Sequence, residues 1–105
     1  MSIKAPFTAI TPKGAQRDFI VSVGDPLQRG DGTWATVVSL EDLYPELQPI
    51  IGGDALQSWS LALLFIRDLL TSYTDGGGQI CFKGTKDEIP IDAYFPGKTG
   101  EEEEE

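Results

Sequence analysis

The feature that most constrains the fold of this chain is a long apolar stripe in its second half. Large apolar side chains recur there at intervals of three and four residues. They are Leu56, Trp59, Leu63, Ile66, Leu70 and Tyr73. Because such residues lie on one face of an α-helix, the spacing predicts an amphipathic helix over residues 55–73. Asp54 suits the N-cap, Gln57 follows it at capping-box spacing, and glycines from Gly76 onward end the pattern.

The segment before this helix has the period-two alternation of β-strands. We expect strands at residues 7–11, 17–23 and 33–40, separated by turns rich in glycine and proline. Successive residues of a strand point to opposite faces, so Phe19, Val21 and Val23 share one face of the second run, and Trp34, Val38 and Leu40 share one face of the third. Residues 41–53 carry two prolines and two glycines and predict an irregular connection to the helix.

After the helix the pattern returns to strands. Residues 79–83 predict a strand with Ile80 and Phe82 facing inward. Residues 88–95 predict a strand that returns antiparallel to it, with Pro90 at an edge position because proline cannot donate to the ladder.

Together these elements predict an α+β fold, an antiparallel sheet of four to five strands with one long amphipathic helix (about 55–73) packed on one face. A chain of 105 residues suits one domain. We expect a single α+β domain over residues 1–97 and a disordered acidic tail over 98–105, where five consecutive glutamates repel one another.

The number of cysteines and the lengths of the apolar segments indicate where in the cell the protein is located. The lone cysteine, Cys81, excludes an intrachain disulfide, which small secreted domains often need, so we expect a cytoplasmic location. The N-terminal residues 1–6 lack the apolar segment of a signal peptide, and the apolar run from Leu61 to Ile66 is too short to cross a bilayer. We therefore expect a soluble protein with no membrane partner.

The charge is strongly negative but concentrated. The chain has a net charge of −9, and five of its 17 acidic residues are Glu101–Glu105. Without this run, 12 acidic residues face 8 basic ones, which leaves a body charge of −4. An acidic body argues against direct nucleic-acid binding, which needs clustered Lys and Arg.

Residues with catalytic or metal-binding chemistry form no recognisable pattern. The chain has no histidine, so Ser-His-Asp and Cys-His arrangements are excluded. One cysteine cannot build a zinc site, and the acidic residues match no calcium-loop spacing. Gly76–Gly78 end a helix, whereas a phosphate-binding loop opens one. We expect a protein that is not an enzyme, with no catalytic residues, no cofactor and no metal.

The helix start carries a family resemblance. Residues 52–63 read Gly-Gly-Asp-Ala-Leu-Gln-Ser-Trp-Ser-Leu-Ala-Leu, and residues 21–26 end a strand as Val-Ser-Val-Gly-Asp-Pro. This is similar to uncharacterised short bacterial proteins, a domain of unknown function in which Gly-x-Asp-x-x-Gln opens a Leu-Ala-Leu helix after a β-meander. The resemblance covers about residues 17–82, and the chain departs from it in 41–53 and after Lys83. It implies the fold and brings no established activity.

One helix can cover only one face of the predicted sheet. The other face would show Ile20, Ala35, Val37, Cys81 and Tyr94, a partly apolar surface of the kind that binds proteins. Acidic loops at Asp25, Asp31, Glu41, Asp42 and Glu46 would complement a basic partner. The candidate partner-binding residues are Ile20, Val37, Glu41, Asp42, Glu46 and Tyr94.

These features favour a small acidic protein inhibitor. The leading hypothesis is an immunity protein that binds and neutralises a bacterial toxin domain, such as a basic toxin or nuclease domain. One alternative is a phage or plasmid anti-defence protein that mimics nucleic acid. Another is a homodimeric accessory subunit without catalysis, pairing through the edge of residues 88–95. An ordinary solvated sheet face, with apolar residues singly exposed, also fits the pattern.

Overall fold

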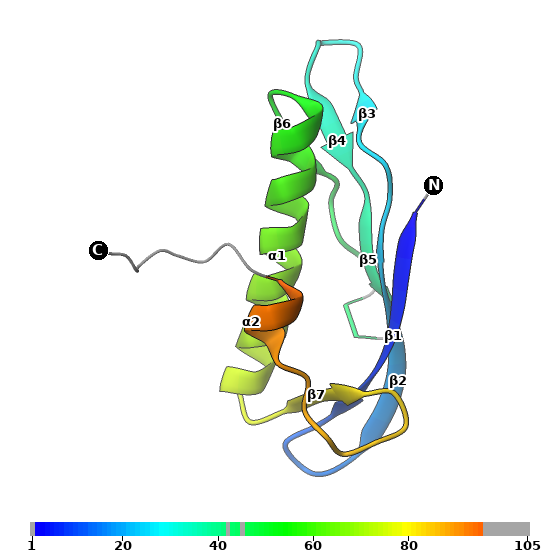
Figure 1. The fold of residues 1–105 in the computed structure, drawn as a ribbon, viewed down its shortest axis with the longest axis vertical. Coiled ribbons are helices and arrows are strands. Elements are labelled where there is room, and N and C mark those ends of the chain that lie inside the picture. The colour runs from blue at the N-terminus through cyan, green and yellow to red at the C-terminus, as the bar shows by residue number, and fades with distance from the viewer. Residues whose placement is uncertain (1, 42, 45, 96–105) are drawn as a thin grey trace, which may run out of the picture.

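The computed structural model describes residues 2–41, 43–44 and 46–95. The elements in chain order are β1 (Ile3–Ile10), β2 (Gln16–Val23), β3 (Leu27–Gln28), β4 (Trp34–Thr36), β5 (Val38–Glu41), β6 (Ile50–Gly52), α1 (Ala55–Asp75), β7 (Gln79–Phe82) and α2 (Ile91–Tyr94). One long helix, α1, lies along one side of the strands (Figure 1). The predicted α+β class, with a long helix packed against antiparallel strands, is confirmed.

The strands of the described residues divide between a four-stranded sheet, in the order β5-β2-β1-β7, and a three-stranded sheet, in the order β3-β4-β6. All of these pairings are antiparallel. The prediction of a single sheet with an unbroken strand at 33–40 is therefore wrong. In addition, β6 lies inside the connection that we expected to be irregular.

A one-residue register change explains the division. Val23 pairs with Val38, whereas Leu27 pairs with Ala35. Three residues, 24–26, therefore lie opposite two residues, 36–37, which is the count of a β-bulge. A bulge increases the local twist, and Pro26 within it cannot donate to the ladder. The bulge also changes the side that odd-numbered residues face. Val21 and Val23 of β2 lie in the core, whereas Leu27 of β3 is exposed.

The side of the strands that faces α1 holds the core. The sheets contribute Phe7, Ala9, Phe19, Val21, Val23, Val38, Leu40 and Ile80. The helix contributes Ala62, Ile66 and Leu70 from one stripe. Because each strand alternates its side chains between faces, this core uses about half of the strand residues and leaves the others on the far side.

Helix α1 begins as the sequence predicts. The carboxylate of Asp54 accepts a hydrogen bond from the backbone N–H of Gln57 at 2.8 Å. The side-chain oxygen of Gln57 reaches back to accept from the N–H of Gly53. This reciprocal pair satisfies backbone donors that a helix start leaves unpaired. The helix continues to Asp75, two residues beyond the predicted end.

The first turn of α1 is held close to the three-stranded sheet by Ser58. Its hydroxyl lies 2.8 Å from that of Thr36 and also donates to the carbonyl of Ile50. Leu56 is two residues away, about 200° around the helix, so it points to solvent and is 74% exposed. The prediction that Leu56 packs in the core with the rest of the apolar stripe is wrong. Ser58, and not Leu56, occupies the position on α1 that contacts β4 and β6.

The C-terminal segment is not the strand that we expected at 88–95. Glu88 forms a single bridge with Cys81, and the N–H of Ile89 donates to Ile80. Pro90 then has no N–H for the ladder, and α2 begins directly after it. The homodimer hypothesis therefore loses the strand edge on which it was based.

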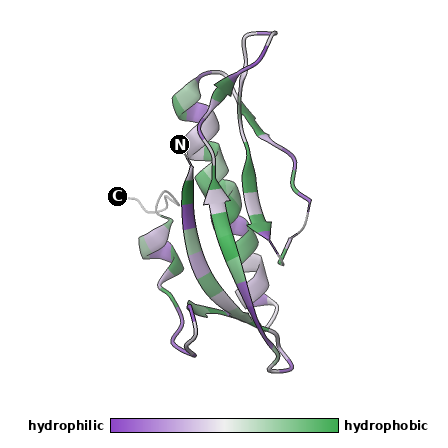
Figure 2. Ribbon diagram, turned by 90° about the vertical axis from the view of Figure 1, so that its right-hand side faces the viewer, coloured by the Kyte–Doolittle hydropathy of each residue, from purple (hydrophilic) through white to green (hydrophobic). Residues whose placement is uncertain are grey.

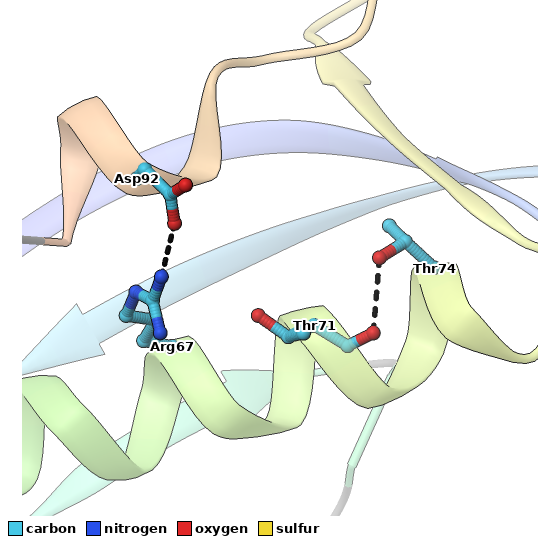
Figure 3. A network of polar contacts seen from close by, with 4 residues as sticks. All are labelled: Arg67, Thr71, Thr74 and Asp92. Atoms are coloured by element: carbon cyan, nitrogen blue, oxygen red, sulfur yellow. Dashed lines mark hydrogen bonds and ion pairs between the residues drawn. The ribbon is translucent and has the colours of Figure 1, made fainter. Parts of the chain in front are cut away.

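Helix α2 packs on α1 through an ion pair. Figure 3 shows Asp92 reaching toward Arg67, whose side chain is about nine-tenths buried. In the described residues Nε of Arg67 has no hydrogen-bond partner. Aromatic contacts join the same region, because the ring of Tyr94 meets those of Phe7 and Phe82. Ile80 is buried as predicted, but Phe82 is 40% exposed.

The predicted tail at 98–105, with the domain end at residue 97, lies outside the described residues. None of the helices in the described part of the chain has the length and apolar character needed to cross a bilayer.

Candidate functional site

The side of the strands away from α1 forms the candidate site, which we call the open sheet face. Its centre is the row Ala35, Val37, Ser39 and Glu41 along β4 and β5. The residues between them point to the core, so Val38 is 3% exposed while the adjacent Val37 is 57% exposed. Figure 2 looks onto this face, with α1 behind the strands and a mixture of apolar and polar residues in front.

One end of the open sheet face is an apolar groove of about 680 Å³. The pairing register places Leu27, Ala35 and Ile51 side by side across β3, β4 and β6. Val37 continues the same face, and Leu27 is 65% exposed. The lining residues of the groove are Leu27, Arg29, Ala35, Val37, Gln48, Pro49 and Ile51. Arg29 is the charged residue in this set.

The other end is a smaller hollow of about 220 Å³, which we call the charged pocket. Its lining residues are Pro6, Asp18, Phe19, Ile20, Glu41 and Lys83. The register places Pro6, Ile20 and Glu41 in one row across β1, β2 and β5. Asp18 lies on the same face one step along β2, because side chains two residues apart in a strand point the same way.

The buried hydroxyl of Thr8 positions the Asp18 carboxylate. Thr8 donates to Oδ1 of Asp18 at 2.7 Å and accepts from the N–H of Gly84 at 2.8 Å. The hydrogen bond from Gly84 ties the turn after β7 to this side of the sheet. One carboxylate of the pocket is therefore held by the hydroxyl of a buried threonine in β1.

The predicted partner-binding residues fall into separate places. Ile20 and Glu41 are direct neighbours in the charged pocket, and Val37 lines the apolar groove on the same face. Glu46 is exposed between β5 and β6 and lines neither hollow. Asp42 lies outside the described residues.

Tyr94 is on the opposite side from the other candidates. Its ring lies 5.7 Å from that of Phe7, which faces α1. Tyr94 also lines an apolar cleft of about 240 Å³ beside Trp59 and Leu63 of the helix. The expectation that Tyr94 shares a face with Ile20 is wrong, because residue 94 belongs to α2 and not to a strand.

Cys81, which we expected on the open sheet face, is buried. It pairs with the buried Thr8, and the turn tied down by Gly84 closes this end of the sheet. Burial raises the pKa of the Cys81 thiol, and the carboxylates of Glu88 and Asp87 raise it further. Since the thiolate is the nucleophilic form, this thiol is suited to packing rather than to chemistry.

Sequence reasoning missed several residues of the open sheet face. Leu27 and Ile51 belong to strands of two and three residues, which are too short for a periodic pattern to be read. Asp18 was recognisable, because it alternates in phase with Ile20. Pro6 comes from β1 and Lys83 from the turn after β7, so their position beside Asp18 depends on tertiary structure.

Charged side chains of both signs lie in or near the two hollows of the open sheet face. The charged pocket combines the carboxylates of Asp18 and Glu41 with the ammonium of Lys83. Near the groove, the hydroxyl and N–H of Thr33 hold the pKa of Asp31 below its ordinary value, and Arg29 adds to this effect. Among the described residues, no group of three or more acidic, cysteine or histidine side chains is placed to hold a metal ion.

Comparison with known proteins adds no identification at this point. No family model, no curated protein and no solved structure matches this chain. The resemblance to short bacterial proteins of unknown function therefore stays a prediction from the sequence.

Proposed function

We propose that this protein is a small inhibitor that acts by binding another protein through the open sheet face, without catalysis of its own. The partner we propose is a bacterial toxin domain, which makes the chain an immunity protein. The observation that carries the proposal is the apolar groove, in which Leu27, Val37 and Ile51 are large apolar residues in reach of solvent on one continuous face.

The energetics of the groove favour an interface. Burying a large apolar side chain is worth about 1.5–3 kcal/mol relative to leaving it in water. Three such residues on one face could therefore contribute several kcal/mol, from which the loss of rotational freedom and side-chain entropy on association is subtracted. Contiguous apolar residues with a polar border are typical of binding surfaces, whereas isolated ones are ordinary.

The charge of the chain favours a basic partner. The net charge of −9 would attract a cationic protein over a distance, which increases the association rate at low salt. Glu41 and Asp18 place negative charge on the open sheet face itself. Toxin domains that act on nucleic acids carry basic surfaces for phosphate, which gives them this complementary charge.

The experiment compares two surface substitutions in a growth-rescue assay. The chain is co-expressed with toxin domains encoded beside its gene, and complexes are captured by affinity purification. We expect the unaltered chain to restore growth and to retain the toxin. Val37→Asp should lose both effects, because it places a charge in the apolar groove.

Leu56→Asp provides the matched control. Leu56 is even more exposed than Val37 but lies on α1, away from the open sheet face. It should keep rescue and capture. Loss with Leu56→Asp and retention with Val37→Asp would place the interface elsewhere. Absence of rescue and capture by the unaltered chain would refute the inhibitor function.

A further inference from the structure

We propose that the partner of the open sheet face presents two anchors, an apolar side chain that enters the groove and an arginine side chain that enters the charged pocket. This inference rests on the proposed function and specifies the chemistry of the partner. It is argued from charge complementarity, from the lining of the pocket and from the spacing along one strand.

The spacing follows from β4 and β5. Val37 lines the groove and Glu41 lines the charged pocket, and both project from the same face of the chain. Glu41 is four residues further along the chain than Val37, and a strand rises about 3.3 Å per residue. The two anchors of the partner are therefore about 13 Å apart.

The charge of the pocket selects a cation. Glu41 lies directly across from Ile20, and Asp18 is the diagonal neighbour, at about 7–8 Å between backbone positions. Both residues line the same hollow. Two carboxylates against the single ammonium of Lys83 leave the pocket with net negative charge, so a cationic side chain is favoured over an anionic one.

The shape of the pocket favours arginine over lysine. Pro6 and Ile20 provide an apolar floor along which an aliphatic stem can lie. A planar guanidinium has five N–H donors in a fixed arrangement and can serve two carboxylates at once. A lysine ammonium would act as a point charge without this fixed arrangement of donors.

The test uses a small probe, so it does not require the partner. The full chain is labelled with ¹⁵N and titrated with arginine blocked at both ends, and its amide shifts are followed by NMR. Blocked citrulline is the matched probe, because it has nearly the same shape without the charge. We expect arginine shifts centred on Ile20 and Glu41, and binding at least several-fold weaker for citrulline. Equal responses to both probes, or shifts centred elsewhere, would overturn the proposal.

Variants identify the groups responsible. Glu41→Gln should weaken arginine binding about two- to five-fold, the range of an exposed ion pair. Lys83→Gln should strengthen it, because a competing cation is removed. Glu46→Gln is the control, since Glu46 is exposed but lies outside the pocket. If Glu41→Gln has no effect, or if Glu46→Gln weakens binding as much, the assigned pocket is wrong.

The spacing is tested with two blocked peptides that carry tryptophan and arginine. Three serines separate the anchors in one peptide, so they span about 13 Å when extended, and one serine separates them in the other. We expect several-fold tighter binding of the longer peptide, and equal affinity would refute the two-anchor arrangement.

The outcomes of the two sets of experiments separate this inference from the proposed function. Growth rescue without arginine binding would remove the two-anchor inference alone. Arginine binding without rescue would remove the inhibitor function and leave the pocket assignment.

Discussion

The two faces of the same strands differ sharply, although their residues alternate along one chain. Val38 faces α1 and is 3% exposed, whereas its neighbour Val37 faces away and is 57% exposed. The covered face contains nearly all of the sheet's contribution to the core. The open sheet face combines apolar residues with Asp18, Glu41 and Lys83. The difference teaches that the face covered by α1 supplies the core, while the open sheet face keeps polar and apolar residues in contact with solvent.

The largest expected effect breaks the covered face. Leu40→Ala removes a fully buried side chain and should lower the free energy of unfolding by about 2–5 kcal/mol. Urea denaturation measures the change. Val37→Ala, on the open sheet face, should alter stability by no more than about 0.5 kcal/mol. Similar losses of unfolding free energy from both substitutions would mean that the covered face does not contribute more to stability than the open sheet face.

A second substitution tests how closely α1 approaches the covered face. A Cβ at Gly52 would lie 2.4 Å from the backbone nitrogen of Ser58, so Gly52→Ala must displace the helix or β6. We expect a loss of about 1–3 kcal/mol in the free energy of unfolding, typical of overpacking. Gly30→Ala is the control, since no atom lies within 4 Å of its added Cβ. Equal stability of both variants would show that Gly52 is not a close-contact position.

A third substitution tests which interactions hold α2 against α1. Asp92→Asn removes the charge that pairs with Arg67, and because Asp92 is mostly exposed the loss should be modest, about 1 kcal/mol. Backbone amides of α2 should exchange faster with deuterium. Asp68→Asn, at an exposed position of α1, should leave that exchange unchanged. Unchanged exchange in Asp92→Asn would show that apolar contacts alone hold α2.

The smallest expected effect concerns Cys81, which is buried where β7 pairs with Thr8 of β1. Burial should make Cys81 react with a disulfide reagent far more slowly in the native protein than in urea. Its pKa is raised in the fold, so above about pH 8.5 the unfolded chain loses a proton that the native protein keeps. Stability therefore falls as pH rises through this range, and Cys81→Ala should reduce that fall slightly. Fast labelling of the native protein would show that the Cys81 thiol is accessible to solvent.

The helix and the class of fold were predictable because their signals are local. The apolar spacing of α1, the N-cap at Asp54 and the glycines after Asp75 all lie within one continuous segment, residues 54–78. Alternation within β2 likewise identified Phe19 and Val21 as core residues. Such patterns depend on helical and strand geometry alone, so they need no knowledge of the partners of each element.

The candidate site was only partly predictable, for a related reason. Ile20, Val37 and Glu41 follow from alternation, but Tyr94 was placed wrongly because Pro90 ends the ladder and leads into α2. The apolar groove depends on pairing among β3, β4 and β6, whose short strands have no pattern of their own.

The sequence by itself determined where α1 runs and which side of the longer strands is apolar, because the periods of helix and strand are properties of the local backbone. The tertiary structure decided the bulge at residues 24–26, the outward position of Leu56 and the burial of Cys81. Each of these depends on atoms distant in sequence that compete for the same space or the same hydrogen bond. Local periodicity contains no information on that competition.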